Sequence, residues 1–295
     1  MNLLIDSTTA GYPSDYLFAR IRYRRATLDS SGAGGRSGPR QAMLGEYIWV
    51  YQQLNHRLRQ QLLPFFEYVE LRTLVIVLRY LAANDPAAVE TQLRLSLLDP
   101  QLKKIVRNAA HVAAAISTLE RQLADNYPYF SGLSTIWLRQ GPGGLEQALL
   151  GGCLQHAVTR NCCPSLREML VYLLDMRNLM ALHKHLHWQV TTPPPFLNGG
   201  TLSAPGYEKI WATRDLHKVG ELMQQQTGLP GDPETIGSEE FLLRGLTRHL
   251  RHIGREPLQI GLVLDYLWRC WMVARDRGLY LSGATSQNEP RQGVQ

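Results

Sequence analysis

The sequence predicts an all-α protein. Apolar residues recur every three or four positions through most of the chain, as on one face of a helix. The alternating apolar and polar runs with paired turn residues that indicate β-hairpins are nearly absent. With 44% hydrophobic residues, the 295-residue chain has enough apolar side chains for packed cores, which excludes disorder over most of its length.

The clearest helical pattern lies between Pro164 and Trp188. Leu166, Leu170 and Leu173 begin one apolar stripe, and a second stripe follows from Leu179 onward, so we expect this helix to be buried on more than one side. Helical periodicity predicts helices at roughly 14–28, 43–62, 65–83, 86–97, 100–125, 144–158, 164–188, 206–227, 238–253 and 256–280.

Segments rich in Gly and Pro separate these helices. They lie at 30–39, 140–144, 191–195 and 228–233. The first is rich enough in Gly and Ser to predict a flexible loop, and the polar residues after Gly283 predict a disordered tail.

A faint internal repeat has a period near 100 residues. The segment 70–74, Glu-Leu-Arg-Thr-Leu, aligns with 175–179, Asp-Met-Arg-Asn-Leu, at a separation of 105 residues. A third copy at 269–273 keeps the apolar positions and lacks the charges. We therefore expect one domain over 1–295 with three pseudo-repeated helical bundles. Their approximate bounds are 1–125, 126–195 with returning helices, and 196–283, followed by a disordered tail at 284–295.

Charge and cysteine content favour some classes of protein over others. The net charge of +6 comes from 31 Lys and Arg against 25 Asp and Glu, which favours acidic partners without choosing among them. No apolar run reaches the roughly 20 residues of a membrane-spanning helix. The first residues have no basic segment typical of a secretory signal, and the four cysteines show no CxxC spacing, so we expect reduced cysteines in a cytoplasmic protein.

Catalytic and cofactor motifs are not apparent. The chain has no GxxxxGK[ST], GxGxxG, HExxH or GxSxG pattern, so an enzyme is the least favoured class and we expect no catalytic residues and no cofactor. His183 and His187 share a helix face at i,i+4 spacing, but a zinc site needs further ligands, so we interpret them as structural or surface histidines and expect no metal.

A basic run near the N-terminus carries the candidate contact residues. Arg20, Arg22, Arg24 and Arg25 surround one tyrosine on a predicted helix, with Arg20 and Arg24 on one face and Arg22 and Arg25 on another. A solvated or salt-bridged face and a contact with an acidic protein both fit this run. Nucleic acid is disfavoured, because no binding module accompanies the charge.

Several ordered segments resemble one known family. Residues 144–149 (GLEQAL) and 166–184 (LREMLVYLLDMRNLMALHK) are similar to a short LExAL helix followed by a long helix with LRxxLxxxxDxxNLxxLL. Residues 196–203 (FLNGGTLS) are similar to FIPGGxLS, 16–22 (YLFARIR) to YxxARVR, and 256–258 to EPL. In this order and spacing they resemble the C-type subunit of rotary V-type (A/V-type) ATPases, whose eukaryotic member is subunit d.

The resemblance implies a funnel-like arrangement of three pseudo-repeated bundles and a non-catalytic role in the central stalk. Such a subunit lies peripherally on the cytoplasmic face of the membrane, one copy per complex. It couples the central-shaft subunits to the proteolipid ring for ATP-linked proton or sodium transport. The positions matching the motifs give structural or partner-contact candidates, which are Tyr16, Arg20, Arg22, Arg24, Arg177 and Asn178.

Other functions stay open. The family carries Glu-x-Arg-Asn-Leu near the C-terminus, where residues 269–273 of this chain read Arg-Cys-Trp-Met-Val. This difference leaves an alternative function, that of a free-standing helical adaptor without a rotary machine. The aromatic residues that can serve as docking anchors are Trp49, Tyr51, Trp137, Trp211, Trp268 and Trp271, although each fits a core position better.

Overall fold

A computed structural model describes residues 1–6, 10–28, 38–160 and 162–287. Over these residues the chain is all-helical, as predicted, and its only β pairing is an isolated bridge between Leu4 and Leu98. The longer elements are α1 (Ser14–Leu28), α2 (Pro39–Gln53), α3 (His56–Ala82), α4 (Pro86–Arg94), α5 (Pro100–Asn108), α6 (Val112–Leu123), α7 (Leu133–Glu146), α8 (Gly152–Thr159), α9 (Pro164–His187), α10 (Ala204–Thr213), α11 (Leu216–Thr227), α13 (Ser238–Ile253) and α14 (Ile260–Gln287). Short elements are η1 (Pro128–Phe130), the π-helical η2 (Gln147–Gly151) and α12 (Pro233–Ile236).

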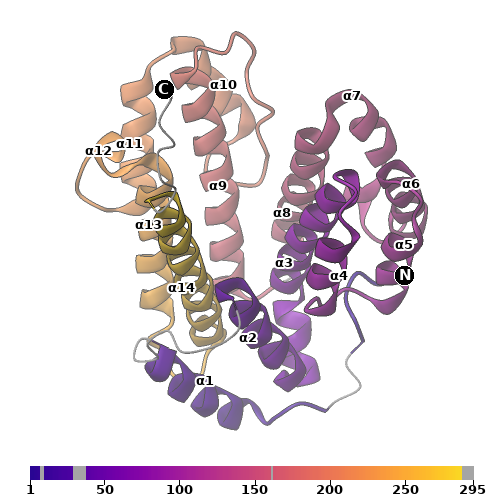
Figure 1. Cartoon of the computed structure of the whole chain (residues 1–295). Helices are drawn as coiled ribbons and strands as arrows, with labels where there is room; N and C mark the ends of the chain where they lie inside the picture. The colour runs from indigo at the N-terminus through magenta and orange to yellow at the C-terminus, as the bar shows by residue number, and fades with distance from the viewer. Residues whose placement is uncertain (7–9, 29–37, 161, 288–295) are drawn as a thin grey trace, which may run out of the picture.

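The helices form two lobes that share one base (Figure 1). Helices α3 to α8 make one lobe and α9 to α13 the other, while α1, α2 and α14 lie where the lobes meet. Helix α14 packs against α2, α13 and α1, and a continuous apolar core runs from α1 to α14. A second, smaller core fills the far end of the α9–α13 lobe.

The three longest helices begin at the same end of the molecule. The first residues of α3 and α9 and the residues that lead into α14 line one surface pocket beside α1, and include Leu58, Pro164 and Ile260. Figure 1 shows the three helices leaving this base in the same general direction. Helix α9 is buried on several sides, as its two apolar stripes predicted, because Leu166, Leu173 and Leu182 are all buried.

Some helix boundaries differ from the predictions because single residues stop helices where the periodicity continues. The break expected near residue 63 lies instead at Leu54–Asn55, where the Asn55 side chain accepts a hydrogen bond from Leu58 N at 3.0 Å. Pro64 lies inside α3, where the burial of neighbouring apolar side chains offsets the hydrogen bond that proline cannot donate.

Two predicted helices are each split in two. The segment 100–125 is interrupted at His111, whose ring Nδ1 accepts from Ala114 N at 3.1 Å and caps α6. The segment 206–227 is interrupted at Arg214, which has φ 54°, followed by Asp215 as the cap of α11. Periodicity alone does not detect such caps, because the apolar pattern is in phase on both sides.

Three of the four predicted breaks lie in the described residues. The break at 140–144 is a kink inside α7 at Gly141 (φ 65°), whereas 191–195 and 228–232 are loops. Most of the Gly- and Ser-rich segment 30–39 lies outside the described residues, and α2 begins at Pro39. Helix α14 continues to Gln287, into the segment expected to be disordered from residue 284, and the rest of that segment lies outside the described residues.

Leu170→Asp tests the packing of α9. Leu170 is 0% exposed, so the substitution places a carboxylate among apolar side chains and is expected to lower the free energy of unfolding by about 3 kcal/mol or more. Urea unfolding followed by circular dichroism measures the change. The matched control is Leu138→Asp on α7, where the leucine is 80% exposed and the expected loss is below about 1 kcal/mol. Equal losses in the two variants would contradict the burial of Leu170.

Candidate functional site

Asp175 lies at the centre of the motif-bearing helix α9, with 1% of its surface exposed. Both of its carboxylate oxygens accept a hydrogen bond from Thr201 N at 3.0 Å, and Oδ1 also accepts from the Tyr207 hydroxyl at 3.2 Å. A Cβ at Gly200 would collide with Oδ1, so the approach of this loop requires a glycine. The buried acid therefore fixes the 196–203 loop against α9.

Asn178, less than one turn further along α9, holds the same loop. Its Nδ2 donates to Leu197 O and its Oδ1 accepts from Leu197 N, both at 2.8 Å. Arg177 points elsewhere and donates from a terminal nitrogen to Gln147 Oε1 at 2.9 Å, on η2. The two residues therefore hydrogen-bond to different segments, Arg177 to η2 and Asn178 to the 196–203 loop.

Glu70 on α3 occupies the aligned position of the repeat and makes an equivalent contact. Its side chain is 2% exposed, and it accepts from Leu97 N at 2.9 Å and from the Ser96 hydroxyl at 2.8 Å. The acid and its backbone partner are 27 residues apart here and 26 apart for Asp175 and Thr201. Burial raises the pKa of Glu70 above its usual value, against the opposing effect of these hydrogen bonds.

Helix α14 also has a buried acid, but at a position that the sequence alignment did not select. The aligned segment 269–273 has no carboxylate, whereas Asp265, one helical turn earlier, has 0% exposure. It accepts from Arg25 at 2.9 Å and from Arg269 Nε at 3.1 Å. An acid inside the apolar run 262–267 was the sequence signal that could have identified it, because buried acids require partners.

The basic run on α1 divides into exposed and internally paired arginines. Arg24 forms an ion pair with Glu46 at 2.7 Å, with its guanidinium carbon 3.9 Å from the centre of the Trp49 ring, and Arg25 pairs with Asp265. Each of the two predicted helix faces therefore carries one exposed arginine and one internally paired arginine. Arg22 is exposed, and the exposed Arg20 donates to the Tyr16 hydroxyl at 3.1 Å.

The exposed large apolar side chains lie towards opposite ends of the fold. Leu138 lies on α7 and Trp188 caps the far end of α9, whereas Tyr16 and Tyr23 on α1 and Leu258 before α14 lie at the base (Figure 1). Of the aromatic anchors expected from the sequence, Tyr51, Trp211 and Trp268 are buried, and Trp49, Trp137 and Trp271 are half-buried. Trp188, which is 67% exposed, was not among them.

The histidine pair packs within the α9–α13 lobe. The rings of His183 and His187 stack at 5.9 Å, and His183 Nε2 lies 3.1 Å from the Ser238 hydroxyl. Burial and the neighbouring His187 lower the pKa of His183. In the part of the chain that the structure describes, no three His, Cys, Asp or Glu side chains are grouped to hold a metal ion.

None of the helices over the described residues combines the length and apolar character needed to cross a bilayer. No protein-family model matches the chain, and no curated protein matches it. These two comparisons therefore do not assign the chain to a family.

Asn178→Ala tests the contact that holds the 196–203 loop. The variant leaves the buried Leu197 N–H and C=O without their partner, so we expect a loss of about 2–4 kcal/mol in the free energy of unfolding. Arg177→Leu removes one hydrogen bond of a half-buried side chain and is expected to lose about 1 kcal/mol or less. Urea unfolding of both variants measures the difference, and a larger loss for Arg177→Leu would contradict the assigned contacts.

Glu70→Gln tests the protonation of the acid on α3. Because its pKa is raised in the folded state, Glu70 contributes most stability below its unfolded pKa and loses that contribution as the pH rises through the folded value. The unfolding free energy of the wild type, minus that of Glu70→Gln, should therefore fall as the pH rises above about 4.5. Chemical unfolding across about pH 3–8 measures this difference.

The exposed acid Glu90 provides a control, because its pKa is shifted in the opposite direction. Its hydrogen bond with Arg107 lowers the pKa of Glu90, so its stabilising contribution is present above the unfolded pKa and is lost as the pH falls. The unfolding free energy of the wild type, minus that of Glu90→Gln, should therefore rise with pH. The same slope in both variants would contradict the burial of the Glu70 carboxylate.

Proposed function

We propose that this chain is a non-catalytic central-stalk subunit of a V/A-type rotary ATPase. In this proposal it couples the central-shaft subunits to the proteolipid ring during ATP-linked proton or sodium transport. It binds peripherally at the cytoplasmic face, one copy per complex, and its three long helices belong to three pseudo-repeated bundles in a funnel-like arrangement. The motifs of α9 and the 196–203 loop resemble those of this family most closely.

The observation that carries the proposal is the shared design of α3, α9 and α14. All three begin at the base, and each has at least one buried carboxylate in its interior: Glu67 and Glu70 on α3, Asp175 on α9 and Asp265 on α14. Glu70 and Asp175 lie at the aligned repeat position, and each accepts a backbone N–H from the segment that returns to its helix. Such correspondence supports repeated units, since two unrelated bundles have no reason to place an acid and its backbone partner at the same spacing.

The packing also suits the transmission of torque, which requires a stiff body. Close-packed interiors have low compressibility and transmit strain. Buried ion pairs tie segments that are distant in the sequence, with Glu67 on α3 bound to Arg160 after α8 at 2.7 Å and Asp265 on α14 bound to Arg25 on α1. Because one partner of each pair is almost fully buried, these contacts resist sliding of one helix past another.

A coupling subunit also needs two docking surfaces, and exposed apolar side chains lie at both ends of the fold. We assign the base, with Tyr16, Tyr23 and Leu258, to the membrane side, because the exposed Arg20 and Arg22 lie on the same helix as the two tyrosines. Each basic residue near an anionic leaflet adds about 1 kcal/mol of attraction. The opposite end, with Leu138 and Trp188, is assigned to the shaft.

Co-purification tests the proposed assembly. The full chain with an affinity tag after Gln295 is expressed in its own host, and native membranes are solubilised in mild detergent. We expect mass spectrometry of the purified material to find both shaft and proteolipid subunits in fixed ratio with the chain. A folded chain that brings down neither would contradict the rotary role and favour the free-standing adaptor.

Arg20→Ala/Arg22→Ala separates lipid attraction from protein docking. We expect the double variant to bind protein-free anionic liposomes more weakly than the wild type, by about thirtyfold at low salt, because each arginine contributes about 1 kcal/mol. At high salt, wild type and variant should both leave such liposomes but stay on membranes that contain the proteolipid ring, because salt screens charges more than packed apolar contacts. Liposome sedimentation and salt washes measure both.

The matched control removes the same charge from another surface. Arg94→Ala/Arg121→Ala replaces exposed arginines on α4 and α6 and should leave liposome binding close to that of the wild type. Equal weakening by both double variants would show that net charge, not the α1 surface, governs attraction. Tight binding to neutral liposomes at high salt would contradict peripheral attachment.

A further inference from the structure

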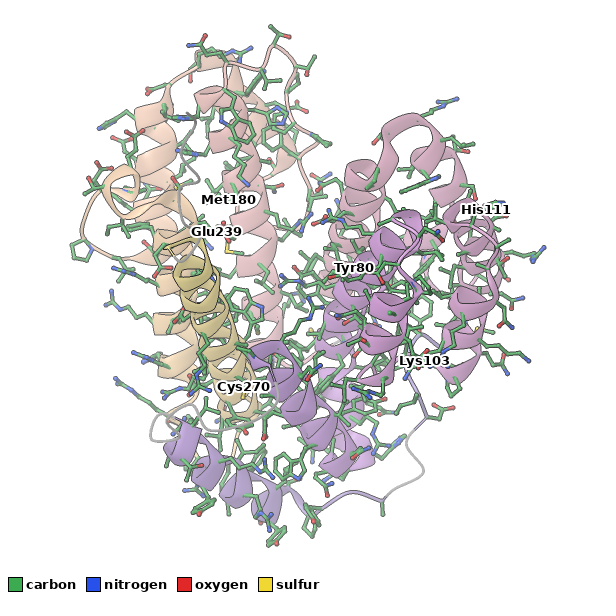
Figure 2. The ribbon with its side chains drawn as sticks, in the orientation of Figure 1. Tyr80, Lys103, His111, Met180, Glu239 and Cys270 are labelled. Carbon is green, nitrogen blue, oxygen red and sulfur yellow. The ribbon has the colours of Figure 1, made fainter. Side chains whose placement is uncertain are left out.

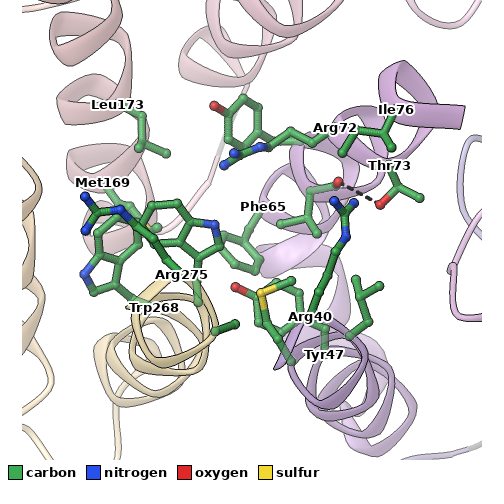
Figure 3. A pocket seen from close by; sticks show the side chains of 16 residues that line it. Arg40, Tyr47, Phe65, Arg72, Thr73, Ile76, Met169, Leu173, Trp268 and Arg275 are labelled. Carbon is green, nitrogen blue, oxygen red and sulfur yellow. Dashed lines mark hydrogen bonds between the residues drawn. The ribbon is translucent and has the colours of Figure 1, made fainter. Parts of the chain in front are cut away.

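A cavity of about 240 Å³ lies where the two lobes meet, between α2, α3, α9 and α14. Figure 3 shows its lining, with Met169 and Leu173 from α9 facing side chains of α3 across the opening. The side-chain view of Figure 2 places Cys270 of α14 near the base, on the same helix as several lining residues. The proposed docking surfaces at the two ends of the fold do not use this cavity.

The walls of the cavity are mostly apolar, and five of the lining residues are aromatic. Trp268 and Trp271 stack at 4.7 Å, and Tyr47 packs against Phe65 at 5.9 Å. The polar atoms of two of these rings are satisfied away from the cavity: Tyr47 donates its hydroxyl proton to Leu267 O, and Trp268 donates Nε1–H to Thr247. These rings therefore offer the cavity apolar faces, against which a flat hydrocarbon surface can pack.

Three arginines, Arg40 on α2, Arg72 on α3 and Arg275 on α14, frame this apolar surface (Figure 3). Arg275 is neutralised by Glu240 at 2.9 Å, and Asp276 lies 3.5 Å from it. The residues from α9 that line the cavity carry no charge. Its charge balance therefore depends on the arginines of α2 and α3.

Arg40 and Arg72 both line the cavity, and both side chains are exposed to solvent. Partial desolvation of Arg40 and repulsion from the like charge of Arg72 both lower the pKa of Arg40. Glu70 partly offsets this effect, but its carboxylate is already engaged by Ser96 and Leu97. The guanidinium carbon of Arg72 lies 5.7 Å from the centre of the Trp271 ring, so the cation sits at the edge of the aromatic wall. An anion placed here would relieve the repulsion.

We propose that this cavity binds a small organic anion with an apolar body, held by Arg40 and Arg72 through its carboxylate or phosphate group. The apolar body packs against Trp268, Trp271 and Phe65. An apolar cavity of about 150 Å³ is sufficient for benzene, so the larger volume here fits a body of about two fused rings or a medium-length alkyl chain. Arginine forms paired hydrogen bonds with carboxylate and phosphate oxygens, which makes these groups the matching ligand chemistry.

Titration with matched probes tests the proposal on the full chain. The anionic probe is 1-naphthoate, and the neutral probe of the same shape is 1-naphthalenemethanol. Isothermal titration calorimetry, supported by quenching of tryptophan fluorescence, should show saturable binding of naphthoate at least about tenfold tighter than that of the alcohol, since a charge-assisted hydrogen bond contributes roughly 1.5–3 kcal/mol. Decanoate as a third probe distinguishes a lipid-derived anion from an aromatic one. Tighter binding of naphthoate or decanoate than of the alcohol supports the site. The tighter of the two anions then shows whether the ligand is aromatic or lipid-derived.

Two variants locate the site, and a third serves as control. Arg72→Gln should weaken naphthoate binding by about tenfold or more while leaving the weak binding of the alcohol unchanged. Ala274→Phe, which fills the cavity from α14, should abolish binding of both probes. The control, Arg79→Gln, removes an exposed arginine of the same helix that pairs with Glu146 outside the cavity, and should bind naphthoate like the wild type.

Circular dichroism and thermal melting of each variant establish that it is folded before titration. No saturable binding of either anion to the wild type, or equal affinity for naphthoate and the alcohol, would overturn the proposal. Naphthoate binding that survives both Arg72→Gln and Ala274→Phe would overturn it as well, because the anion would then bind elsewhere. None of these outcomes depends on assembly with other subunits, so this test and the co-purification succeed or fail separately.

Discussion

A carboxylate buried inside a helix has lost its water and must find donors within the protein, and this requirement shapes the fold at several places. Glu70 and Asp175 each take a backbone N–H from a segment that returns to the helix, and Asp265 takes the guanidinium of Arg25. Removing one partner leaves an uncompensated buried group, so each segment is held in position by the acid to which it donates a hydrogen bond. These contacts thereby fix the positions of the two loops and of α1 relative to the long helices.

The same requirement explains why the basic run on α1, near the N-terminus, is bound to α14, near the C-terminus. Arg25 reaches a helix that follows it by 240 residues, and the neighbouring Arg24 pairs with Glu46 on α2. These pairs leave the exposed Arg20 and Arg22 as the part of the run available to a partner. Helix α1 therefore combines internally paired and exposed arginines within a few positions, an arrangement that suits the coupling role we propose.

The junction of the lobes differs from the buried ion pairs of the interior, because two of the arginines that line its cavity are exposed and have no acid of the described residues beside them in an ion pair. Arg40 and Arg72 face one apolar cavity without a hydrogen-bonded acid there, while Arg275 is neutralised by Glu240. Elsewhere, the ion pairs of Glu67 and Asp265 join helices tightly. Repulsion between the two cations works against closing the cavity where α2, α3, α9 and α14 meet.

The sequence by itself determined the all-α class, the two-sided burial of α9 and the alignment of Glu70 with Asp175, because these follow from local periodicity and spacing. Tertiary structure decided what single residues do. It buried Asp265, which lies one turn before the aligned position on α14. It also ended helices near Asn55, His111 and Arg214 and paired Arg24 and Arg25 with acids of other helices. The physical reason is that caps, ion pairs and cavities depend on which distant side chains meet, and that information is spread over the whole chain rather than contained in any one segment.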